Sequence, residues 1–125
     1  MNIISFKKRR ALMARPDRSE LVRRVADAIR RGEIDLAEWL IGEHGTDSSQ
    51  SAECLNLLGV IAVAEDDWRK AKRCWRRATE IDSAYQPALR NLRRYYELNE
   101  FGKSGEELCL GDEPEFSRER EGDES

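Results

Sequence analysis

The sequence predicts an all-α protein built from pairs of antiparallel helices. The chain has 125 residues, enough for one domain with a small core. Its apolar residues recur at the i, i+3 and i+7 spacing of amphipathic helices. The sequence also matches itself at a fixed shift, which aligns Leu21 with Leu55 and Leu89. This 34-residue period indicates a stack of repeated helical units.

The first unit spans residues 18–51. Ser19 is the expected N-cap of a helix over Leu21–Arg31, because serine accepts a hydrogen bond from the first helical turn. Gly32 ends that helix, and a return helix follows over Asp35–Glu43.

The second unit, residues 52–85, has the clearest pattern. Its first helix is expected over 52–64 and its second over 68–80, separated by the polar residues 65–67. Gly59 lets the second helix pack close to the backbone of the first. The apolar stripe of the second helix consists of Trp68, Ala71, Trp75 and Ala78. Its opposite face carries Arg69, Lys70, Lys72, Arg73, Arg76 and Arg77.

Residues 86–100 predict a single helix that caps the stack. Arg93 occupies the place of Gly59, so we expect no full-sized partner helix to follow. The expected inward stripe is Leu89, Leu92 and Tyr96, with Arg90, Arg93, Arg94 and Glu97 facing away. Because about three repeats are usually needed for stability, the exposed end requires a cover. It is supplied by Phe101, Leu108 and Leu110 folding back, or by a partner or second copy.

The formal net charge of −3 conceals oppositely charged ends. Residues 1–18 carry a net charge of +5, and residues 111–125 carry −5. We expect residues 1–17 to form a flexible basic leader and residues 101–125 a largely disordered acidic tail. The tail either provides solubility or folds over the basic helix face of the second unit. The apolar residues 3–6 are either part of a disordered leader or an occupant of a groove.

The second unit carries the motif Leu55-x2-Leu58-Gly59-x2-Ala62, followed by Ala71-x3-Trp75 and Ala78. This pattern resembles the tetratricopeptide repeat at its 34-residue period. The first unit matches less closely, because Val25 stands where glycine is usual and His44 where alanine is usual. The resemblance covers about two-thirds of the chain. It implies a short right-handed α-solenoid of about 2.5 units, in which the first helix of each pair lines a concave groove.

The resemblance implies a protein-binding adaptor or scaffold that holds a peptide or helix of a partner in this groove. The corresponding positions are Val22, Ala26, Ile29, Asn56, Val60, Val63, Arg90 and Arg94. They predict an apolar trough with cations at one end, suited to an apolar peptide that carries an acidic residue. Val22 and Ala26 stand where one subgroup of the family binds the C-terminal carboxylate of chaperones, and neither side chain can do so. The alternative is that these aliphatic residues are ordinary core.

Other functions stay open at this point. Small proteins of this fold include chaperones of secreted substrates, a similarity of size and fold only. The arginine-rich helix faces allow a nucleic-acid-associated role, but no aromatic stacking platform accompanies them, so we expect no nucleic-acid partner. A homodimer through the exposed end of the stack is a further alternative.

We expect no enzyme, metal or cofactor. His44 is the only histidine, and the three cysteines lack metal-ligand spacing. Buried free thiols fit a reducing, cytoplasmic setting. No apolar run approaches the length that a membrane-spanning helix needs.

Overall fold

The computed structural model describes residues 17–44, 51–101 and 107–116. These residues contain five long helices and no strand, which confirms the expected all-α class. The helices are α2 (Arg18–Arg30), α3 (Ile34–His44), α4 (Ala52–Ala64), α5 (Trp68–Ile81) and α6 (Gln86–Phe101). Residues 1–16, including the basic leader and its apolar residues 3–6, lie outside the described residues.

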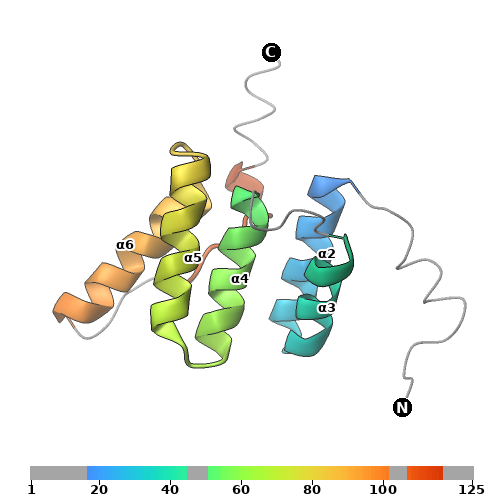
Figure 1. Ribbon diagram of the computed structural model, residues 1–125, viewed down its shortest axis with the longest axis horizontal. Coiled ribbons are helices and arrows are strands. Elements are labelled where there is room, and N and C mark those ends of the chain that lie inside the picture. Colours follow the sequence, from blue (N-terminus) through green and yellow to red (C-terminus); the bar gives the residue numbers. More distant parts are fainter. Residues whose placement is uncertain (1–16, 45–50, 102–106, 117–125) are drawn as a thin grey trace, which may run out of the picture.

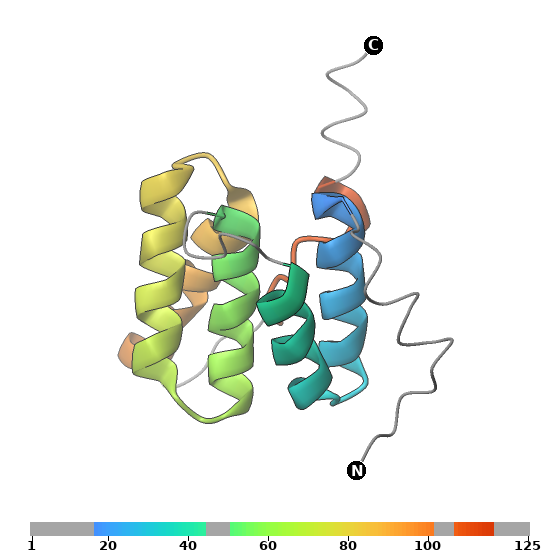
Figure 2. The same cartoon turned by 45° about the vertical axis from the view of Figure 1, so that its right-hand side comes forward.

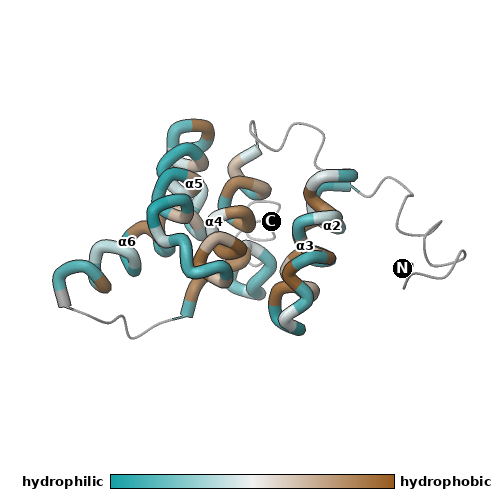
Figure 3. Tube along the Cα trace, turned by 60° about the horizontal axis from the view of Figure 1, so that its bottom comes forward, coloured by the Kyte–Doolittle hydropathy of each residue, from teal (hydrophilic) through white to brown (hydrophobic). Residues whose placement is uncertain are grey.

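The helices pack mainly as neighbours in sequence. Helix α2 packs against α3, α4 against α5, and α5 against α6. Figures 1 and 2 show α4 and α5 side by side, joined by a short turn, with α2 and α3 forming a second such pair. Figure 3 shows a mostly hydrophilic α5 beside a largely hydrophobic α4. Helix α4 is therefore the central element of the packing.

The first helices of the two units have equivalent N-caps. The Asp17 side chain accepts a hydrogen bond from the Glu20 amide at 2.8 Å, and the Ser51 side chain accepts one from the Cys54 amide at 3.1 Å. The two caps lie one sequence period apart. The prediction that Ser19 caps α2 is wrong, because the preceding aspartate at position 17 already satisfies the free amide of the first turn.

The turns that end α2 and α4 also repeat at this spacing. Gly32 and Asp66 both adopt the left-handed conformation, with φ of 78° and 62°. In each turn, the amide of the next residue donates to a carbonyl at the end of the helix, from Glu33 to Ala28 and from Asp67 to Ala62, at 2.8 Å. Glycine tolerates this conformation without strain and aspartate is among the few other residues that adopt it. The 34-residue sequence period is therefore also a period of backbone hydrogen bonding.

Trp75 is the largest fully buried side chain and connects α5 to α4. Its indole Nε1 donates to the carbonyl of Asn56 at 3.2 Å. A Cβ atom added to Gly59 would lie only 2.4 Å from that Nε1 atom. The expected close approach at Gly59 is thus confirmed, and an indole ring occupies the space.

Helix α6 turns a different face inward from the one its apolar pattern predicted. Ala88, Asn91 and Arg94 are buried, whereas Leu89 and Tyr96 are 36% and 47% exposed. The buried face is rotated by roughly a third of a turn from the expected stripe. The predicted inward positions of Leu89 and Tyr96, and the outward position of Arg94, are therefore wrong.

The segment after α6 explains this orientation. Among the described residues beyond the helix, none forms a long helix that could cover its outer apolar side. Residues 107–116 instead pack on its other side, where Cys109, Leu110 and Phe116 are buried. We call residues 107–116 the tail segment. Although we expected 101–125 to be largely disordered, the tail segment packs against the helices. Leu110 folds back into the core cluster and not over the end of the stack, because Leu89 and Tyr96 on the outer side of α6 stay exposed.

No helix among residues 17–44, 51–101 and 107–116 combines the length and apolar character needed to cross a membrane.

Replacement of Gly59 tests the contact between α4 and α5. Gly59→Ala should lower the free energy of unfolding by roughly 1–3 kcal/mol, because the rigid indole of Trp75 cannot yield to a methyl group without shifting α5. The measurement is urea unfolding followed by circular dichroism. Gly42→Ala on α3 is the matched control. Nothing lies within 4 Å of its added Cβ, so it should stabilise by roughly 0.5–1 kcal/mol. Stabilisation by both substitutions would contradict the close packing.

Candidate functional site

The predicted groove positions lie on α2, α4 and α6, and the tail segment contacts all three helices. Figures 1 and 2 show it in orange-red beside α2 and α4. Of the eight positions, those that contact or closely approach the tail segment are Val22, Asn56, Arg90 and Arg94. Ala26 and Val60 belong to the buried core cluster, and Ile29 and Val63 pack against that cluster. The site thus holds a polypeptide segment of the same chain.

Asn91 pairs with both main-chain polar groups of Cys109. Its side-chain oxygen accepts from the Cys109 amide at 2.7 Å, and its side-chain nitrogen donates to the Cys109 carbonyl at 2.8 Å. Asn56 donates to the same carbonyl at 3.0 Å, and its own side-chain oxygen accepts from Asn91 at 2.8 Å. Both asparagines are fully buried.

An asparagine side chain offers one acceptor and two donors in a geometry that matches a peptide group. Asn56 and Asn91, which we call the amide pair, therefore bind the main chain at Cys109 and form no hydrogen bond with its side chain. Buried amides also require such partners, since an unsatisfied polar group costs roughly 1–3 kcal/mol. The pair is thus fitted to an extended polypeptide passing over α4 and α6.

The groove prediction did not include Asn91. Asn91 directly follows Arg90 in the sequence, and at the 34-residue shift it aligns with the buried Leu57. A polar residue in that place is the signal that could have identified it. It was missed because the apolar stripe assigned the wrong inward face to α6.

Arg94 is a buried cation at the same point. The residue is 6% exposed, and its guanidinium contacts the Cys109 Sγ at 3.1 Å. Burial raises the pKa of the Cys109 thiol, while the hydrogen bond and charge of Arg94 act in the opposite direction. The net upward direction keeps the thiol protonated at neutral pH.

Two arginines hold the acidic part of the tail segment. Arg30 on α2 donates two hydrogen bonds to the Asp112 carboxylate, at 2.8 and 2.5 Å, and the pairing raises the pKa of the guanidinium. Arg90 on α6 pairs with Glu115 and lies over the Phe116 ring, 5.1 Å from its centroid. The acidic residues of the tail segment therefore pair with arginines of α2 and α6. The alternative in which they cover the basic face of α5 is wrong for residues 111–116.

The tail segment makes a sharp turn at Gly111, whose φ is 103°. The Glu113 carboxylate accepts from the amides of Leu110 and Gly111, each at 2.8 Å. A Cβ at Gly111 would lie 2.6 Å from the Tyr85 hydroxyl oxygen. Glycine is needed here for both its backbone conformation and its lack of a side chain.

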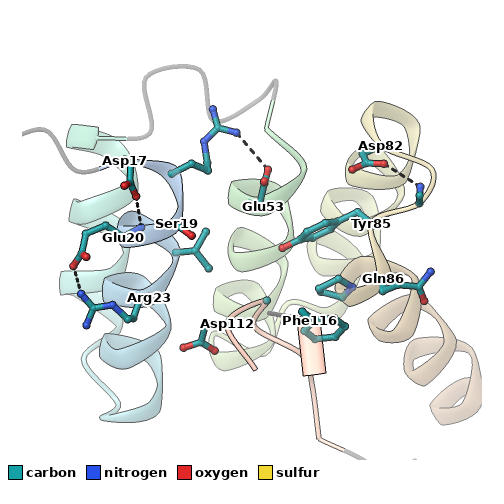
Figure 4. A pocket seen from close by; sticks show the side chains of 15 residues that line it. Asp17, Ser19, Glu20, Arg23, Glu53, Asp82, Tyr85, Gln86, Asp112 and Phe116 are labelled. Carbon is teal, nitrogen blue, oxygen red and sulfur yellow. Dashed lines mark hydrogen bonds and ion pairs between the residues drawn. The ribbon is translucent and has the colours of Figure 1, made fainter. Parts of the chain in front are cut away.

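An open cleft of about 910 Å³ adjoins the tail segment, as Figure 4 shows. Its walls come from the first turns of α2 and α4, from the α5–α6 turn and from the tail segment itself. Arg18 bonds to Glu53 at 3.3 Å on one side of the cleft, and Tyr85 faces it from the other. The cleft therefore lies open beside Gly111, Asp112 and Phe116 of the tail segment.

The three cysteines are free thiols. Within the described ranges, no three His, Cys, Asp or Glu side chains gather as a metal site would require. His44 lies edge-on to Trp39, with 6.0 Å between ring centroids.

Comparison of the chain with protein-family models, with curated proteins and with solved structures returned no match.

Removal of the Asn91 amide tests the tail-segment contacts. Asn91→Ala should lower the free energy of unfolding by about 2–4 kcal/mol, because it leaves the Cys109 amide and the Asn56 side-chain oxygen without partners. Hydrogen exchange at the Cys109 amide should accelerate at the same time. The control is Asn99→Ala on the exposed side of α6, which should change stability by less than about 0.5 kcal/mol. Unchanged protection at Cys109 would contradict the pairing.

Proposed function

We propose that the protein is a tetratricopeptide-type interaction module, a short α-solenoid whose groove between α2, α4 and α6 binds an extended segment of a partner protein. The observation that carries the proposal is the buried amide pair of Asn56 and Asn91, which binds the main chain of a polypeptide. The repetition of caps and turns at the 34-residue sequence period supports the repeat assignment.

The occupant of the groove favours an extended peptide over a helix. Residues 107–110 of the tail segment are not helical, and its main chain rather than a helix face contacts the asparagines. Hydrogen bonds to the main chain supply affinity and neighbouring pockets supply specificity in this mode of peptide recognition. A role as adaptor and a role as chaperone of one substrate both use this binding mode.

The exposed cations of α5 do not enter this proposal. Arg69, Arg73 and Arg76 are exposed on the outer face of the helix. Lys72 lies 5.5 Å from the centroid of the Tyr95 ring and packs on it. Such a face is suited to solvation and serves as a control surface in the experiment below.

A library of displayed peptides, selected on the full-length chain, tests the proposal. Arg90→Glu should weaken binding of the selected peptides at least about tenfold, since charge reversal places a carboxylate at the acidic end of the ligand. Isothermal titration calorimetry measures the affinity.

The matched control is Arg73→Glu on α5, which makes the same change of charge on the outer face and should leave peptide affinity within about twofold. Peptides whose binding depends on Arg73 and not on Arg90 would instead place the ligand on the outer face of α5. Selection of no peptide that depends on Arg90 would overturn the proposed function.

A further inference from the structure

We infer that the tail segment is a tethered stand-in for the partner, and that the partner's binding motif is apolar–small–apolar–glycine–acidic, followed by a second acid three residues later. The inference rests on the proposed function and specifies its ligand. It rests on how the groove holds each position of Leu108–Glu115.

The first half of the motif follows from burial. Leu110 is 6% exposed and lies in the core cluster, while the half-buried Leu108 packs against that cluster. Between them, Cys109 is bound through its main chain and its thiol lies against Arg94. These contacts favour a small side chain with one apolar side chain before it and one after it.

The second half follows from backbone conformation and charge. Gly111 has a positive φ and approaches Tyr85 too closely for a side chain. The next residue, Asp112, meets Arg30, and Glu115 meets Arg90. The groove therefore selects a glycine turn followed by acids at these two positions.

The helical stack does not depend on the tail segment for most of its core. Leu110 is the one residue of the tail segment among the buried members of the core cluster, which otherwise come from α2 to α6. Its acids sit in ion pairs with partly exposed arginines; the Arg30 side chain, for example, is 45% exposed. Ion pairs of this kind contribute little individually, so a competing peptide can replace the segment.

Tethering nevertheless gives the tail segment an advantage. Only residues 102–106 separate it from the end of α6. A short linker produces an effective concentration on the order of 1 mM, so a free peptide of equal affinity is outcompeted. A partner overcomes this by contacts that the tail segment lacks, and the cleft beside Asp112 and Phe116 offers them. The tail segment thereby selects partners that extend into the cleft.

The test uses full-length chains and a fluorescent peptide with the sequence of residues 107–116. Gly111→Val in the chain should expel the tail segment and leave the groove residues unchanged. The peptide should bind this variant at least tenfold more tightly than the wild-type chain in an anisotropy titration. A peptide with the same valine substitution is the matched control and should bind neither chain.

A charge swap tests the register of binding. The chain with both Arg90→Glu and Gly111→Val should no longer bind the peptide. A peptide that carries arginine in place of Glu115 should restore binding to this chain. Saturating peptide should also accelerate alkylation of Cys109 in the wild-type chain. Cys54, buried within α4, is the internal control and should keep its rate.

Circular dichroism verifies that the Gly111→Val chain stays helical. If that chain unfolds, Glu115→Arg replaces it as a milder release of the tail segment, since this side chain is 54% exposed. If a variant is folded, has its tail segment released and still does not bind the peptide, the inference is overturned. The tail segment then has only a structural role. The proposed function survives that result if selected peptides of another pattern still depend on Arg90, and falls with it if none do.

Discussion

Asn56 makes the contacts on which the rest of the structure depends. Its carbonyl accepts the indole N–H of Trp75, which holds α5 against α4. Its side chain binds both Asn91 on α6 and the main chain of Cys109. One fully buried residue thus connects two helices and the tail segment to α4. A buried amide is tolerated only when its polar atoms are paired, so its partners are constrained to fixed positions.

The two-helix units could be predicted from sequence because their determinants are local. Each unit begins with a cap, Asp17 or Ser51, and turns at a left-handed residue, Gly32 or Asp66, and the interval between the two is the same in both units. Caps and turns act on amides and carbonyls only a few positions away. The expected α4 range of 52–64 agrees with the structure. Gly59 was also interpretable, since a glycine inside a helix costs stability unless a neighbour needs its space.

The orientation of α6 and the place of the tail segment were not predictable in the same way. An apolar stripe indicates which side of a helix is suited to burial, but the neighbours decide which side is covered. On α6 those neighbours are α5 and a segment that follows in sequence, and they favour Asn91 over Leu89. The acidic composition around Asp112 suggested disorder. Composition alone does not show that Asp112 pairs with Arg30 on a helix distant in sequence. Five of the eight predicted groove positions lie in the core cluster or pack against it for the same reason, including Val22.

The tail segment has a kinetic consequence. Its release from α4 and α6 is a unimolecular step, whose rate is set by withdrawal of Leu110 from the core and by breakage of the bonds to Cys109. Any molecule that requires the same space must wait for this step. The observed association rate of such a molecule should therefore rise with its concentration only to a plateau. The plateau equals the rate at which the tail segment is released, so it is the same for every ligand.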